Sequence, residues 1–236
     1  MIKQRGIYVL AILIGFLLAV LFLGTSVLLD FIGRPPHAVG DVISFGGHNW
    51  RVLDVQDDRA LLLSEQILEQ RAFDDASSLE RITWETSSLR YYLNNEFINN
   101  TFTNEERVRI AETRLFNNPN SWFESDYGGV TYDMIFLLSI NEVIQYFGDS
   151  GMFASRESNI PGVMGRRIFS DRYNNARVAT WEGDQPFIWL LRSPGQASGG
   201  QRSYVTHVNE AGHIVVEGVP LIVSNGGIRP AFWLYF

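Results

Sequence analysis

Residues 7–29 form a mostly aliphatic stretch without a single charged side chain, and this stretch constrains where the rest of the chain can lie. As a helix rising about 1.5 Å per residue, it is long enough to cross a hydrocarbon core of about 30 Å. Lys3 and Arg5 precede it, and the positive-inside tendency keeps such an end in the cytoplasm. We therefore expect a single-pass protein of the cell membrane, with a cytoplasmic tail (1–6), a transmembrane helix (7–29), a spacer (30–37) and an extracytoplasmic domain (38–236).

Two alternatives to this topology remain open. A cleaved signal peptide has an apolar core of about 7–15 residues that ends at a site of small residues. The apolar stretch here is longer, and Gly24-Thr25-Ser26 is only a weak match to such a site. Arg34 follows the stretch and reduces the charge asymmetry, so a domain that faces inward is the second alternative.

The composition of the chain excludes several kinds of partner and site. Its net charge of −7 disfavours nucleic acid and anionic lipid surfaces as partners. The absence of cysteine excludes disulfides, thiolate metal sites, cysteine nucleophiles and a lipid anchor on cysteine. A core must therefore hold the outer domain, and the 16 Phe, 9 Tyr and 6 Trp can supply one.

The residue pattern predicts a single domain with β-structure at both ends and helices between them. Gly46-Gly47 indicates a hairpin in an opening β-meander, and serine and threonine side chains before Leu89 and Leu93 indicate a helix start. Further strands are expected near the C-terminus. The predicted strands are 42–45, 50–55, 60–63, 135–138, 187–191, 203–208, 213–216 and 231–236.

Two capping boxes predict further helices. Thr103-Asn104-Glu105-Glu106 is expected to start a short helix that carries Val108 and Ile110. Ser139-Ile140-Asn141-Glu142 is expected to start another that continues through Phe147.

Eight short phrases, which lie in a fixed order across nearly the whole outer segment, carry a family resemblance. They occupy 50–55, 60–65, 83–90, 92–97, 102–106, 136–139, 189–195 and 226–231. In order and spacing they resemble DUF6273, a bacterial domain family of unknown function. The family commonly has two tryptophans before the Leu-Arg-Ser-Pro-Gly phrase, and Ile188 takes the place of the first one here.

The closing phrase Gly227-Ile228-Arg229-Pro230 is also similar to the last strand of C-type-lectin-like and formylglycine-generating-type domains. This looser resemblance implies an α+β fold, with small twisted antiparallel sheets, flanking helices and long loops. It does not imply a function. The oxidation performed by formylglycine-generating enzymes needs cysteine, so that activity is excluded here.

The same phrases also have a structural interpretation. Trp84 lies where a helix is expected to start, and Arg90 and Arg192 are expected to pair with buried carboxylates or loop carbonyls, since a guanidinium offers five donors. Arg229, just before Pro230, is expected to tie a loop to the last strand.

No pattern of catalytic or metal-binding residues stands out. His37, His48, His207 and His213 lack the spacing of known metal sites, and no serine has the context of an activated nucleophile. Asp57-Asp58 and Asp74-Asp75 are expected in solvated turns. We therefore assign no catalytic residue, no metal and no cofactor.

Two loops place aromatic side chains beside acids and glycines, an arrangement that suits sugar stacking or peptide docking. The candidate ligand-binding residues are Trp122, Glu124, Tyr127, Trp181, Glu182, Asp184 and Arg192. The alternative is that the two tryptophans anchor their loops on the core, and that Arg192 is part of the fold.

The leading interpretation is a non-catalytic recognition module that binds an envelope glycan or a partner protein. An envelope polysaccharide hydrolase with an unidentified acid pair and an assembly module of a membrane complex are the alternatives.

Overall fold

The computed structural model describes residues 37–75, 82–123, 125–151, 153, 168–196 and 204–236. Residues 38–236 form one compact unit, separate from 1–37, and only this unit is described below. The predicted transmembrane helix at 7–29 lies outside the described residues. Among the residues that are described, no helix has the length and apolar character needed to cross a membrane.

The first sheet contains the predicted β-meander and the C-terminal strand. Its order is β1-β2-β3-β15-β5, and all of its neighbours are antiparallel. Gly46 and Gly47 join the first hairpin with φ of +54° and +75°, the conformation that a tight hairpin turn favours. The strands are β1 (Val42–Phe45), β2 (His48–Gln56), β3 (Arg59–Ser64), β5 (Ile110–Ala111) and β15 (Ala231–Tyr235).

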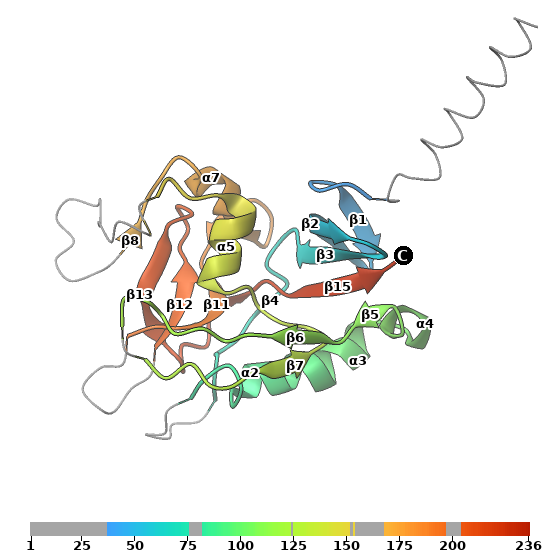
Figure 1. The fold of residues 1–236 in the computed structure, drawn as a ribbon, viewed down its shortest axis with the longest axis horizontal. Coiled ribbons are helices and arrows are strands. Elements are labelled where there is room, and N and C mark those ends of the chain that lie inside the picture. The colour runs from blue at the N-terminus through green and yellow to red at the C-terminus, as the bar shows by residue number, and fades with distance from the viewer. Residues whose placement is uncertain (1–36, 76–81, 124, 152, 154–167, 197–203) are drawn as a thin grey trace, which may run out of the picture. The chain divides into compact units, whose positions relative to one another are not determined.

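The second sheet has the order β4-β14-β11-β12-β13-β8. The pair β11–β14 is parallel, and the other pairs are antiparallel. A small hairpin, β6–β7 (Figure 1), and a second one, β9–β10, accompany the sheets. The strands are β4 (Glu69–Gln70), β6 (Thr113–Leu115), β7 (Thr131–Asp133), β8 (Ile168–Phe169), β9 (Ala179–Trp181), β10 (Gln185–Phe187), β11 (Trp189–Pro194), β12 (Tyr204–Val208), β13 (Ile214–Pro220) and β14 (Gly227–Ile228).

The helices are short and begin where the sequence supplies caps. Ser87 caps the first of them, and both predicted capping boxes are formed, by Thr103 with Glu106 and by Ser139 with Glu142. Figure 1 shows α5 beside α7 and the second sheet. The elements are α2 (Ser88–Tyr92), a π-helical turn η1 (Leu93–Phe97), α3 (Ile98–Thr101), α4 (Asn104–Arg107), α5 (Ile140–Phe147) and α7 (Asn174–Arg177).

One continuous core joins both sheets and the helices. Trp50 packs edge-on against Phe232 with ring centroids 4.7 Å apart, and Phe102 lies against both rings. Burial of large aromatic rings supplies the stabilisation that disulfides cannot give this chain. The predicted α+β class with small antiparallel sheets is confirmed.

Three local predictions are wrong. The helix that starts at Asn104 ends at Arg107, so Val108 is 80% exposed and Ile110 lies in β5, where it pairs with Leu234. Residues 135–138 are buried, but only Phe136 makes a β-bridge, to Ala231.

The third error concerns the acidic pair Asp74-Asp75. Asp74 is buried rather than solvated, and its carboxylate accepts a hydrogen bond from the Ser88 backbone N–H at 2.8 Å. It therefore helps to cap α2, a role that local sequence does not reveal because the two residues come from separate segments.

Candidate functional site

A pocket of about 430 Å³ opens between the first sheet and the helices α5 and α7. Its volume lies within the range of about 300–1,000 Å³ that is usual for small-molecule sites. The lining comes from the segment before β1, from β2, from the end of β3, from α5 and α7, and from the junction of β14 and β15. The lining residues are Val39, Gly40, Arg51, Val52, Leu53, Glu65, Tyr146, Phe147, Asn175, Ala176, Val178 and Arg229.

Arg51 and Glu65 form an ion pair at this pocket. The Arg51 Nε donates to Glu65 Oε2 at 2.8 Å, and the Arg51 Nη2 donates to the other carboxylate oxygen. The Arg51 Nη1 donates to the Gly40 carbonyl at 3.1 Å. The two side chains are 37% and 32% exposed, so solvent reaches the pair.

Arg229 lines the same pocket but is only 3% exposed. Its Nε donates to the Ser64 carbonyl at 2.8 Å, and its Nη2 donates to the Glu65 carbonyl at 3.3 Å. The guanidinium carbon lies 5.2 Å from the ring centre of Trp189 and 5.7 Å from that of Phe147. These bonds join the residue that leads into the last strand, β15, to the end of β3 and the residue that follows it, and the Pro230 carbonyl accepts from the Ser64 N–H at 3.0 Å.

The charge of Arg229 is not neutralised by contact with a carboxylate. Among the described residues it makes no ion pair, and its Nη1 has no hydrogen-bond partner. Burial lowers the pKa of Arg229 to about 10, so the group still carries its charge at neutral pH. The pocket therefore borders on a buried, positively charged guanidinium.

Tyr146 supplies a neutral hydroxyl to the pocket from α5. Burial, with a smaller contribution from the negative charges of Asp54 and Glu142, raises its pKa to about 12. A neutral phenol can both donate and accept a hydrogen bond, while its ring offers an apolar face.

Two other buried arginines have their own carboxylates. Arg192 donates to Glu142 through both terminal nitrogens and to the Leu137 carbonyl at 2.7 Å, and Arg177 lies 3.0 Å from Asp171. Burial on its own raises the pKa of Glu142, but the charge and hydrogen bonds of Arg192, with those of Ser139, hold the pKa below its ordinary value.

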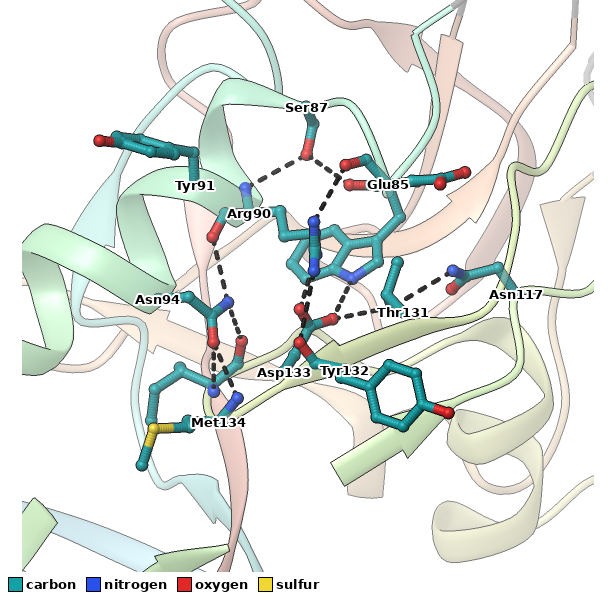
Figure 2. A network of polar contacts seen from close by, with 12 residues as sticks. Glu85, Ser87, Arg90, Tyr91, Asn94, Asn117, Thr131, Tyr132, Asp133 and Met134 are labelled. Carbon is teal, nitrogen blue, oxygen red and sulfur yellow. Dashed lines mark hydrogen bonds and ion pairs between the residues drawn. The ribbon is translucent and has the colours of Figure 1, made fainter. Parts of the chain in front are cut away.

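A polar network around Asp133 joins α2 to the β6–β7 hairpin (Figure 2). Asp133 accepts from Trp84 Nε1 at 2.8 Å, from Arg90 Nε at 2.6 Å and from Thr131 Oγ1 at 2.9 Å. Asn94 extends the network to Met134 and the following residue. Trp84 lies before α2, which Ser87 caps, and both Trp84 and Arg90 bind the Asp133 carboxylate.

None of the predicted ligand-binding residues that the structure describes lines this pocket. Trp122 packs with its ring 4.9 Å from that of Phe169, so it anchors its loop to the core. Tyr127 is 41% exposed, and Glu124 lies outside the described residues.

The second predicted loop is the turn between β9 and β10. Trp181 packs partly on the core, whereas Glu182, in the left-handed region with φ of +46°, and Asp184 are exposed. Arg192 lies inside the fold with its terminal nitrogens bonded to Glu142 and Leu137. The structure brings none of these residues together with Arg229.

The residues that sequence reasoning missed are Arg51, Glu65 and Tyr146. Arg51 and Glu65 do lie in phrases that carry the family resemblance, which was the available signal. Their convergence with Arg229 depends on the pairing of β2, β3 and β15.

A comparison with protein families identifies the family of this chain. The model of DUF6273, a domain of unknown function, matches residues 57–236, and the chain belongs to this family. The comparison with curated proteins and that with solved structures each gave no match.

Proposed function

We propose that this domain is a non-catalytic recognition module that binds an envelope glycan in the pocket beside Arg229. The observation that carries the proposal is the pocket itself, about 430 Å³ in volume, in which guanidinium, carboxylate, phenol and amide groups lie beside apolar side chains. Small-molecule sites combine apolar surface with polar groups that fix the orientation of the ligand. A helix at 7–29 would hold the module outside the membrane.

The size of the pocket favours a sugar over a folded protein partner. A stable protein interface buries about 800 Å² on each partner, whereas this site is a compact recess. The aromatic side chains of Tyr146 and Phe147 supply apolar surface, and Asn175 supplies an amide.

Binding without turnover agrees with the acids at the site. Among the described lining residues Glu65 is the sole carboxylate, and Arg51 holds it in an ion pair. Glycoside hydrolysis by the usual route needs a pair of carboxyl groups about 5–10 Å apart across the scissile bond. The residues that line the pocket therefore favour ligand binding over hydrolysis.

A different surface supports the assembly alternative. Phe116, Val130 and Tyr132 are exposed on or beside the β6–β7 hairpin. Exposed apolar side chains that cluster mark protein contacts in many proteins.

A thermal-shift screen of the full chain in non-ionic detergent, with soluble envelope glycan fragments, tests the proposal. A ligand at about 100 times its Kd adds about 2.7 kcal/mol to the free energy of unfolding. Ala176 is exposed on α7 and lines the pocket, so Ala176→Trp fills the pocket with little expected cost to the fold.

Val108→Trp is the matched control, since Val108 is exposed and lies on a different element. We expect the shift to persist in Val108→Trp and to vanish in Ala176→Trp. A shift that survives Ala176→Trp would contradict the assignment of the site. No shift with any glycan, together with a membrane partner that co-purifies, would support the assembly alternative instead.

A further inference from the structure

The charge balance at the pocket indicates the chemical class of the ligand. Charged side chains are almost never fully buried unless they are paired, because removal from water is costly. Arg177 and Arg192 obey this rule through Asp171 and Glu142. Arg229 is equally buried, yet its hydrogen bonds go to backbone carbonyls, which carry no net charge.

The charge of the Glu65 carboxylate acts on Arg229 from a distance, but the carboxylate does not contact the guanidinium. Glu65 offers Arg229 only its backbone carbonyl, while its side chain is bonded to Arg51. The charged lining that the structure describes therefore consists of two guanidinium groups and one carboxylate. The pocket keeps a net positive charge in a chain whose overall net charge is −7.

We propose that the pocket binds a sugar acid, whose carboxylate is held by Arg229 and Arg51 and whose ring lies against Tyr146 and Phe147. This inference rests on the proposed function and specifies its ligand. A carboxylate supplies the counter-charge that Arg229 lacks, and a guanidinium matches its planar geometry. Glu65 already accepts hydrogen bonds from the Arg51 guanidinium. The ligand carboxylate and the Glu65 carboxylate therefore compete for the N–H groups of Arg51.

That competition gives a test in which the direction of the effect is diagnostic. The probes are N-acetylmuramic acid and N-acetylglucosamine, which share a sugar ring but differ by a carboxylate-bearing group. Isothermal titration calorimetry on the full chain in detergent measures both affinities. We expect the acid to bind at least about tenfold more tightly, since charge-assisted hydrogen bonds are among the stronger ones.

Substitutions at the solvent-reached ion pair change the charge at the pocket and leave the buried Arg229 in place. Glu65→Gln removes the competing charge and should tighten binding of the acid several-fold, whereas Arg51→Gln should weaken it. Glu69→Gln is the matched control, because Glu69 also pairs with an arginine, Arg71, at a similar exposure of 34%. We expect that control to leave both affinities unchanged.

The outcomes separate the inference from the proposed function. Equal affinity for the two sugars, or equal weakening by Glu65→Gln and Arg51→Gln, would overturn the sugar-acid inference but leave glycan recognition standing. No binding of either sugar, or of glucuronate and galacturonate, would overturn the inference. No shift with any glycan in the thermal-shift screen, whether neutral or acidic, would overturn the proposed function as well.

Discussion

The network around Asp133 and the pocket beside Arg229 use the same kinds of group in opposite ways. Asp133 is buried, and it receives donors from Trp84, Arg90 and Thr131, so its charge is balanced inside the fold (Figure 2). Arg229 is just as buried, but no described carboxylate contacts it, and a pocket lies beside it. The charge of Asp133 is thus balanced within the fold, whereas the charge of Arg229 is the basis of the proposed ligand site.

An unbonded N–H alone does not make this distinction. Arg177 and Arg192 each leave Nε without a hydrogen-bond partner among the described residues, as Arg229 leaves Nη1. Both of those arginines nevertheless contact a carboxylate. Balance of charge, rather than a count of hydrogen bonds, therefore separates the two kinds of site.

The largest effect is expected from Asp133→Ala. This change leaves the buried Trp84 N–H without its acceptor and the Arg90 guanidinium, which is 28% exposed, without its carboxylate. Because solvent reaches Arg90, we expect a loss of about 3 kcal/mol, at the lower end of the range for a broken buried pair. Urea unfolding measures the loss. The comparison holds if the free energy of unfolding depends equally steeply on urea concentration in the two proteins. Tyr132→Ala, at an exposed neighbour in the same strand, is the control and should change the free energy of unfolding by about 0.5 kcal/mol or less. Equal losses in the two variants would show that the network does not hold the fold.

The sequence predicted the internally balanced sites better than the pocket. Capping boxes at Thr103 and Ser139 are visible because their partners lie only a few residues away. Arg229 and Ser64 are 165 residues apart, and only strand pairing brings them together. Local pattern thus indicates caps and strands but cannot show which side chains share a pocket.

The loop tryptophans illustrate a second limit. An aromatic residue among acids and glycines has the composition of a binding loop, whether its ring points outward or packs on the core. Trp122 packs on Phe169, and this depends on where β8 lies. Whether a side chain is exposed depends on tertiary structure. The local sequence is therefore the same for a tryptophan that binds a ligand and for one that packs on the core.

An intermediate effect, with a characteristic pH dependence, is expected from Glu142→Gln. The pKa of Glu142 is held below its ordinary value of 4.5, so the folded state binds fewer protons than the unfolded state as pH falls. The stabilisation is complete above that ordinary value and is lost as pH falls through the lower folded pKa. The variant keeps a neutral hydrogen bond to Arg192 but loses the charge, which we expect to cost about 2 kcal/mol near neutral pH.

Unfolding of wild type and Glu142→Gln at about pH 7 and about pH 3 tests this. The variant carries no charge at this position at either pH, whereas the wild type loses stabilisation from the Glu142 charge as the pH falls below the ordinary pKa of 4.5. The difference between them should shrink there. A difference that stays constant would mean that shape, rather than charge, accounts for the loss.

The smallest effect on stability is expected from Arg229→Met, and it tests the comparison most directly. Methionine keeps much of the side-chain volume against Trp189 and Phe147, and it abolishes a charge that no described carboxylate balances. The cost is then limited to the hydrogen bonds to the Ser64 and Glu65 carbonyls, about 1–2 kcal/mol in total. Arg192→Met is the matched control, because it leaves the Glu142 carboxylate without its ion-pair partner. It should lower the free energy of unfolding by about 3 kcal/mol or more. If Arg229→Met costs as much as Arg192→Met, Arg229 is a structural arginine like the others, and its charge needs no ligand to explain it.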